Sequence, residues 1–567
     1  MVLNEALRRI PPALRLLLWC LLGAVLVHWV LARLAPGQPA GNPFNFSPIF
    51  WTLLAAYDGH GNLLLALIAV LAFLLRGNPA VEALARGAGE HPWTVAAVAL
   101  PLLGAGALLV YRAYPLSMDE TTAAFQAQAF AAGRLAGQFP PDLLDQLMPR
   151  FPRGLFFTVS RATGEVSSGY WPGFALLLAP FAWLGVPWAA NPVISALSLP
   201  AIHRLTLALS GSREAAGWAL LLTLASPVFV VNAFSFYAMP AHLLCNLLFT
   251  LLLLQPTVLR ALLAGLVGSL ALTLHNPAPH LLFAAALVVW LLLRRAPLAV
   301  WAALAAGYLP LLLLLGWGWQ QHLAGLAAGA APAPAAAASA PAAASGGGSA
   351  ASRIAGAVAS ALTLPGPRII EARLAGLSKV WTWGAAALMV LAAWGYAAAR
   401  SVPGINALAA ALVLTFVGFF FVPFDQGHGW GFRYLHSAWF VLPLLAGIGL
   451  ARLPDAEARS MAGWAVALSL VLANGLRVVQ VDSFFARHLA QVPPLAQAAA
   501  PRKQEILFIE PDRGSYTRDM VRNDPLLRGP RLLMVYDGPE RTAALMARHF
   551  PDYTRRAQGQ WGELWAK

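Results

Sequence analysis

The sequence predicts an all-α polytopic membrane protein with a small external α/β domain at its C-terminal end. Only 11% of the 567 residues are charged and 59% are hydrophobic, whereas a soluble domain carries about 25% charged residues. Apolar runs recur between residues 13 and 473. Residues 481–567 then return to a mixed composition, as a folded domain outside the membrane would.

The charge pattern indicates contact with membrane lipids and not with nucleic acid. The chain has 38 Lys and Arg against 24 Asp and Glu, a formal charge of +14, but the basic residues stand mostly singly or in pairs between apolar runs. Basic residues placed in this way set the topology of a membrane protein. The two cysteines, Cys20 and Cys245, lie in apolar runs and cannot form a disulfide framework or a zinc cluster.

A spanning helix needs about 20 mainly apolar residues, because only a helix satisfies its own backbone hydrogen bonds in hydrocarbon. This length, with basic residues kept on one side, predicts about thirteen spans. They are 13–34, 62–75, 93–110, 192–208, 216–231, 242–254, 262–274, 281–293, 298–315, 381–397, 407–421, 439–450 and 464–473. Residues 173–184 are too few to cross and are predicted to be re-entrant or interfacial.

Arg8 and Arg9 before the first span place the N-terminus in the cytoplasm, and an odd number of spans places the C-terminal domain outside. An alanine excess and a preference for Arg over Lys are typical of a GC-rich bacterial genome. We therefore expect a multi-pass protein of the bacterial inner (plasma) membrane, with a periplasmic C-terminal domain in the cell envelope.

The predicted organisation is a transmembrane domain over 1–480 and an external α/β domain over 481–567. The transmembrane domain includes an external loop, 112–172, and an external low-complexity insertion, 320–365, rich in Ala, Pro, Gly and Ser. The C-terminal domain is expected to contain short strands at 506–509 and 532–536 and a helix at 543–550.

The external loop 112–172 carries the strongest candidates for catalysis, Asp119 and Glu120. Apolar residues at helical spacing follow them, which predicts a helix on the membrane surface up to Gly133. Ser117 and Glu120 match a capping box, so a purely structural role is an alternative for Glu120. That alternative leaves Asp119 free, because neighbours on a helix point about 100° apart.

This acidic pair after a span, the surface helix, and the Tyr-Trp-Pro-Gly-Phe-Ala-Leu-Leu-Leu-Ala-Pro-Phe run at 170–181 resemble the GT-C membrane glycosyltransferases. Within this superfamily the chain resembles the protein mannosyltransferase and aminoarabinose transferase groups. The resemblance implies inverting transfer of a sugar from a polyprenyl-phosphate donor to a lipid, glycan or protein acceptor on the external face. It also implies that Asp119 faces the acceptor and that Glu120 is its companion.

A phosphate departs as a stable anion, so one carboxylate acting as general base and a few cations suffice for such a reaction. The candidate phosphate-binding cations on the external side are Arg150, Arg153, Arg161, Lys379 and Arg433. Arg433 lies in a run of glycines and aromatics, 429–436, in which Tyr434 is a candidate for stacking on sugar or prenyl groups. The alternative for Arg433 is an interface anchor beside an aromatic belt.

Further candidates for substrate binding are Tyr170, Tyr237, His242 and His275, all on the external side by topology. The tyrosines are expected at the membrane interface and, secondly, in a cavity wall. The histidine spacings match no metal-ligand motif, so we expect neither a metal nor a cofactor.

A polytopic transporter or flippase for a lipid-linked or polar substrate is the alternative function, because many spans with proline-broken helices suit alternating access. It requires ionisable residues near the middle of the spans. The sequence has almost none there and concentrates its acids and bases on one external face, which favours the enzyme.

Overall fold

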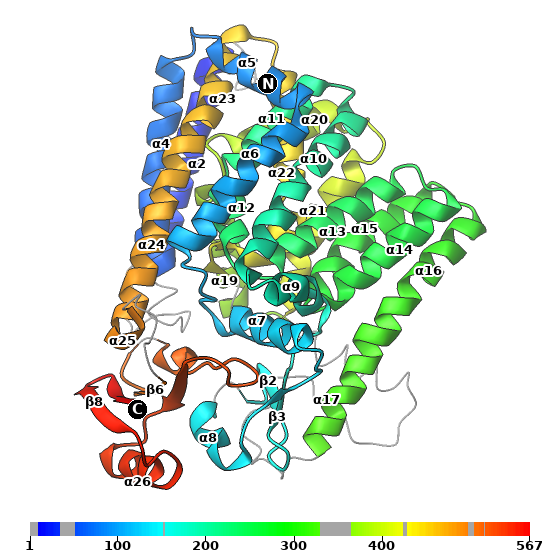
Figure 1. Ribbon diagram of the computed structural model, residues 1–567. Coiled ribbons are helices and arrows are strands. Elements are labelled where there is room, and N and C mark those ends of the chain that lie inside the picture. The colour runs from blue at the N-terminus through cyan, green and yellow to red at the C-terminus, as the bar shows by residue number, and fades with distance from the viewer. Residues whose placement is uncertain are drawn as a thin grey trace.

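The computed structural model describes residues 10–34, 52–150, 153–328, 364–422, 428–496, 504–514 and 516–567. In this part of the chain, long helices form one body, and a smaller mixed domain lies at one end of it (Figure 1). Residues 329–363, which make up most of the predicted low-complexity insertion, lie outside the described residues.

The helices from the two ends of the chain lie side by side along one edge of the body (Figure 1). They are α2 (Pro12–Leu34), α4 (Asp58–Leu74), α23 (Ala456–Leu468) and α24 (Asn474–Ala490). On α2, Trp19, Val25 and Trp29 are at least half exposed. Large apolar side chains on an outer face are expected where lipid surrounds the helix.

The central helices follow along the chain. They are α5 (Ala80–Glu90), α6 (Pro92–Ala105), α10 (Ala190–Ser210), α11 (Arg213–Leu224), α12 (Pro227–Phe234), α13 (Met239–Leu253), α14 (Val258–Thr273) and α15 (Ala278–Leu293). The segment that includes residues 112–172 separates α6 from α10. Helices α11 and α12 meet at a 58° bend. Pro227 begins α12 and has no N–H to donate, so the helix breaks there.

The remaining helices of the body are α16 (Leu298–Leu311), α17 (Trp319–Ala328), α19 (Pro367–Thr382), α20 (Leu388–Ala399), α21 (Ile405–Gly418) and α22 (Val441–Ala451). Small residues let two pairs of these helices approach closely. A Cβ on Gly307 of α16 would overlap the backbone of α14, and one on Gly395 of α20 would overlap the Leu445 carbonyl of α22. Such contacts are characteristic of helix packing in membranes.

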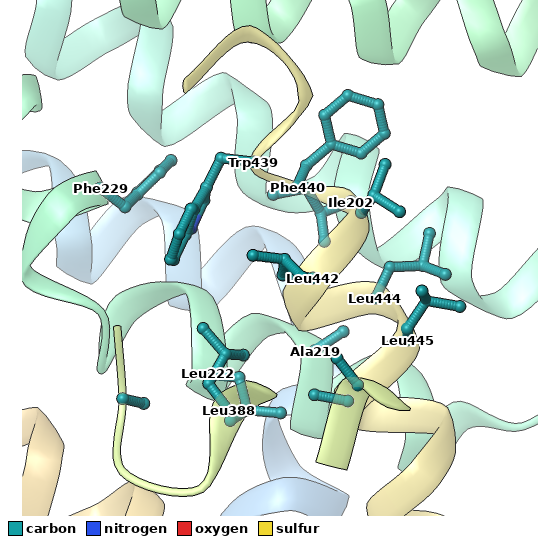
Figure 2. Close-up of a cluster of buried hydrophobic side chains, with 14 of the residues drawn as sticks. Ile202, Ala219, Leu222, Phe229, Leu388, Trp439, Phe440, Leu442, Leu444 and Leu445 are labelled. Atoms are coloured by element: carbon teal, nitrogen blue, oxygen red, sulfur yellow. The ribbon is translucent and has the colours of Figure 1, made fainter. Parts of the chain in front are cut away.

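The core of the body lies where α10, α11, α12, α20 and α22 converge. Figure 2 shows part of it, in which Leu222, Phe229 and Leu388 lie near Trp439 and Leu442. All of these side chains are buried. The centre is therefore packed with apolar groups and is not an open pore.

The all-α polytopic class is confirmed. Five described helices are long and apolar enough to cross a membrane by length and composition, and a sixth if the bent pair α11 and α12 is one span. Several further apolar helices have 10–17 residues. The count of about thirteen crossings and the orientation of the termini stay predictions.

The external loop predicted at 112–172 forms a compact layer across one end of the body (Figure 1). It contains α7 (Met118–Ala131), α8 (Leu144–Leu147) and three short antiparallel strands in the order β1-β3-β2, which are β1 (Gly137–Gln138), β2 (Phe157–Val159) and β3 (Glu165–Ser168). Helix α9 (Gly173–Trp183) follows and has only 11 residues. It is too short to span, as the sequence predicted.

The C-terminal domain is the predicted small α/β unit. Its sheet has the order β7-β6-β9-β8, with β6 and β7 parallel and the other pairs antiparallel. Its elements are α25 (Pro493–Ala496), β6 (Glu505–Ile509), β7 (Arg531–Val535), α26 (Pro539–His549), β8 (Thr554–Gly559) and β9 (Gly562–Ala566). One side of the sheet shares an apolar cluster with the external loop, so the two lie against each other.

Candidate active site

Helix α7 begins with the predicted capping box. The Ser117 hydroxyl accepts a hydrogen bond from the Glu120 N–H, and Glu120 Oε2 accepts one from the Ser117 N–H at 2.9 Å. Glu120 Oε1 accepts from the Tyr111 hydroxyl at 3.0 Å and from the Phe236 N–H at 2.9 Å. Burial raises the pKa of Glu120, although these donors oppose the shift. Glu120 thus ties α7 to two neighbouring segments.

Asp119 has different partners, because adjacent residues on a helix point in different directions. Its Oδ1 accepts a hydrogen bond from the Tyr170 hydroxyl at 2.5 Å, and its Oδ2 lies 2.6 Å from Arg433 Nη2. The Asp119 side chain is 10% exposed. Burial alone would raise the pKa of Asp119, but Arg433, His275 and the Tyr170 hydroxyl together hold it below the ordinary 3.8. The carboxylate is therefore ionised at neutral pH.

A tight hairpin brings Arg433 to Asp119. Its strands are β4 (His428–Gly429) and β5 (Gly431–Phe432), and Arg433 follows β5 directly. Gly431 has a φ of +81°, a conformation that favours glycine, and a Cβ there would also overlap Val228. The Arg433 guanidinium lies 4.3 Å from the centre of the Tyr237 ring. Because the ring and Asp119 both hold it, the cation is fixed at the site.

A cleft lies beside Asp119, between α7, β3, the segment before α9, and the turns before α13 and α15. It is lined by Asp119, Ala123, Ser168, Tyr170, Trp171, Phe174, Ala175, Tyr237, Ala238, Leu274 and His275. Most of this wall is apolar or aromatic, with a few polar groups beside one carboxylate. That combination is typical of a small-molecule site.

His275 presents a neutral imidazole to this cleft. Its ring stacks on Tyr170 with 3.9 Å between centres. Burial lowers the pKa of His275 to about 4, outweighing the opposite effect of Asp119. Its Nδ1 lies 3.1 Å from the Asn276 side-chain amide, whereas its buried Nε2 has no hydrogen-bond partner among the described residues. This nitrogen is a buried polar atom beside the cleft whose hydrogen-bonding capacity is unused among the described residues.

Three predicted phosphate-binding cations lie elsewhere in the external loop. Arg153 and Arg161 pair with Asp145, at 2.5 and 3.1 Å between nitrogen and Oδ1, and Arg150 is exposed. The structure therefore brings Arg433 to Asp119 but not these three arginines. A role for them in phosphate binding stays a prediction.

Lys379, the fourth predicted cation, is fully buried at the end of α19. Its Nζ lies 2.7 Å from Asp58 Oδ2, and Asp58 Oδ1 accepts a hydrogen bond from the Trp383 indole at 2.7 Å. Arg477 Nη2 is 3.4 Å from the same carboxylate. Lys379 thus belongs to a buried cluster of ions with Asp58 and Arg477. Its role in substrate binding stays a prediction.

Two further candidates, His242 and Tyr434, do not line the described cleft. His242 is buried on α13, one turn after Ala238, which does line it. The Tyr434 ring stacks on Phe419 at 4.4 Å between centres. Among the described residues, no group of three or more His, Cys, Asp or Glu side chains is placed to hold a metal ion.

The sequence did not single out Tyr111, Trp171 or Phe174. Trp171 and Phe174 lie within the Tyr170–Phe181 run that carried the resemblance, so their position was a usable signal. Tyr111 had none, because it stands at the end of an apolar run and resembles an ordinary interface aromatic. Only the fold shows that its hydroxyl bonds to Glu120.

The fold is similar to that of a solved structure. The chain is similar to ArnT from Cupriavidus metallidurans bound to undecaprenyl phosphate, with a TM-score of 0.50 and 12% identity over 84% of this chain and 98% of that chain. ArnT in the apo state matches with a TM-score of 0.48 and 13% identity over 83% and 97%. No family model and no curated protein sequence matches the chain. The first match confirms the GT-C-like fold that the sequence predicted.

Proposed function

We propose that this protein transfers a sugar from a polyprenyl-phosphate donor to a lipid, glycan or protein acceptor on the external face of the membrane. The observation that carries the proposal is the ionised Asp119, paired with Arg433 beside an aromatic-lined cleft. The GT-C-like fold supports it, and the similar ArnT was crystallised with undecaprenyl phosphate.

In the proposed reaction, Asp119 accepts the proton of the acceptor hydroxyl while the oxygen of that hydroxyl bonds to the anomeric carbon of the sugar. The bond from that carbon to the phosphate oxygen breaks at the same time, and the lipid phosphate leaves as an anion. Attack opposite the leaving group inverts the anomeric configuration. A phosphate needs no general acid, so one base and one nearby cation are sufficient.

Arg433 has two partners in this scheme, the Asp119 carboxylate and the donor phosphate. A carboxylate paired with a guanidinium is a weak base, because the cation stabilises its charged form. A phosphate at the same guanidinium competes for its N–H donors. Donor binding would thus weaken the 2.6 Å pair and make Asp119 a stronger base when substrate is present.

The side chains that line the cleft have the chemistry that binds a sugar ring. Tyr170 and Tyr237 each combine an aromatic face with a hydroxyl, and Trp171 adds a further aromatic surface. Aromatic faces pack against the C–H groups of a sugar, while the polar groups at the rim bond to its hydroxyls. The hydroxyls of Ser168 and Tyr237 are two such polar groups.

The experiment is a comparison of envelope lipids and glycans by mass spectrometry, in cells with and without the protein. It identifies the product, whose formation is then measured for Asp119→Asn. We expect a loss of about 10²-fold or more, because the amide cannot accept the proton. Asp142→Asn is the control, since Asp142 is an exposed acid of the same loop. Full activity of Asp119→Asn would reject the proposal.

The transporter alternative requires ionisable groups near the middle of the spans. The buried ions Asp58, Lys379 and Arg477 are the observation that could favour it. They satisfy one another, however, because both cations lie within 3.4 Å of the one Asp58 carboxylate. We therefore favour the transferase.

A further inference from the structure

A loop of the C-terminal domain, residues 521–527, packs against the start of the external layer. The Pro525 carbonyl accepts a hydrogen bond from the Gln138 N–H at 2.7 Å, and the Asn523 side-chain amide donates to the Leu147 carbonyl at 3.1 Å. The apolar cluster shared by the two layers includes Phe139, Phe508 and Met534. The domain is thus joined to the loop that carries Asp119.

Arg522 makes the contacts closest to the candidate site. Its Nη1 donates to the Pro115 carbonyl, and its Nη2 donates to the Leu116 carbonyl at 3.1 Å. Its Nε donates to the Asp519 carbonyl at 2.7 Å, and its guanidinium lies 4.5 Å from the centre of the Tyr114 ring. All three guanidinium nitrogens are engaged, so the side chain has one orientation.

The backbone just before α7, whose carbonyls bind Arg522, is also held by Glu120 on α7 itself. Glu120 Oε2 accepts hydrogen bonds from the Leu116 and Ser117 N–H groups, at 3.0 and 2.9 Å. Arg522 binds the carbonyls of the same short segment. Because both the donors and the acceptors of this backbone are bound, the peptide planes just before α7 cannot rotate freely. Asp119 is the second residue of that helix.

We propose that Arg522 is a positioning residue, through which the C-terminal domain holds the start of α7 and hence the Asp119 carboxylate in reacting geometry. This inference rests on the proposed function. It gives the C-terminal domain a part in the reaction without direct contact with substrate. Displacement of a reacting group by about 1 Å can cost about 10²-fold in rate, so a small shift of α7 is enough.

The test uses the full-length protein in detergent or lipid, with a donor and acceptor pair identified from the product analysis. For Arg522→Gln we expect kcat to fall about 10-fold or more, with the donor KM changed less than about 3-fold. Arg522→Lys should recover part of the loss, because one ammonium bonds to one carbonyl but cannot span two. Arg518→Gln is the matched control, since Arg518 is half-exposed and pairs with Asp512.

Thermal unfolding of each variant separates positioning from folding. Wild-type kcat per folded molecule in Arg522→Gln would overturn the inference, even with a lower melting temperature. If Arg522→Gln does not fold, the kcat of Arg522→Lys is used instead. A wild-type kcat in that variant would overturn the inference, and a reduced kcat would support it. Asp119→Asn is assayed in parallel. Its full activity would remove the proposed function and this inference together, whereas inactive Asp119→Asn with fully active Arg522→Gln would overturn the positioning role alone.

Discussion

Asp119 and Glu120 are adjacent acids in opposite electrostatic surroundings. Glu120 is enclosed by backbone and hydroxyl donors from its own helix end and from Phe236, and no cation pairs with it in the described structure. Asp119 faces a cation, a phenol and a cleft. When their surroundings give two neighbouring carboxyl groups different pKa values, the two groups can take different roles. The geometry thus favours Glu120 as the structural member and Asp119 as the reactive one.

This difference predicts a shift in pH dependence when Arg433 loses its charge. In the wild-type protein the pKa of Asp119 lies below the ordinary 3.8, because Arg433, His275 and Tyr170 outweigh the effect of burial. In Arg433→Gln the burial remains and the cation is gone, so the pKa rises. The acidic limb of the kcat/KM profile, which reports the free enzyme, should therefore move to higher pH, and kcat/KM at its plateau should fall about 10²-fold.

The measurement is kcat/KM against pH for wild type, Arg433→Gln and Arg433→Lys. The lysine variant keeps a positive charge, so its acidic limb should stay near that of the wild type. Identical limbs in all three proteins would show that Arg433 does not set the ionisation of Asp119. The stability that this depressed pKa provides is present above pH 3.8 and is lost as pH falls through the lower, folded-state value.

At the scale of the elements, close helix contacts fix where the loops of the site emerge. Helices α20 and α22 touch where Gly395 and Gly449 face each other, and the hairpin carrying Arg433 leads into α22. A Cβ on Gly395 would overlap the Leu445 carbonyl, which is backbone and cannot turn aside. The spacing of these helices therefore depends on the absence of a side chain.

Gly395→Ala should consequently destabilise the protein, whereas Gly475→Ala should not. The first forces α20 and α22 apart and should cost about 1–3 kcal/mol, as overpacking does. The second lies on the exposed side of α24 with nothing within 4 Å. It should be neutral or stabilise by up to about 1 kcal/mol through helix propensity. Thermal unfolding in one detergent compares them, and equal effects would contradict the packing argument.

Features set by neighbours in sequence were predictable, and those set by distant packing were not. The start of α7 followed from Ser117 and Glu120, and strands β6 and β7 followed from their apolar residues. Strand β8 gave no signal, because all six of its residues are exposed and it pairs only along β9. The partners of Asp119 come from Tyr170 and Arg433, 51 and 314 residues away. Only the assembled helices bring them together.

At the scale of the whole molecule, one buried ion cluster links helices from the N-terminal and C-terminal parts of the chain. Asp58 begins α4, Lys379 lies near the end of α19 and Arg477 lies in the first turn of α24. The three side chains are at most 1% exposed. Two cations share one carboxylate, so removal of that carboxylate leaves two charges buried without an acidic partner.

Asp58→Asn should therefore destabilise the protein by about 3–5 kcal/mol, the cost of breaking a buried pair. The control is Asp482→Asn, since Asp482 pairs with Arg112 at the surface and is 48% exposed. That change should cost less than about 1 kcal/mol. Melting temperature and kcat per folded molecule are measured for both. If Lys379 serves only this cluster, Asp58→Asn lowers the melting temperature and leaves the donor KM unchanged. A raised donor KM without loss of stability would instead support Lys379 as a phosphate ligand.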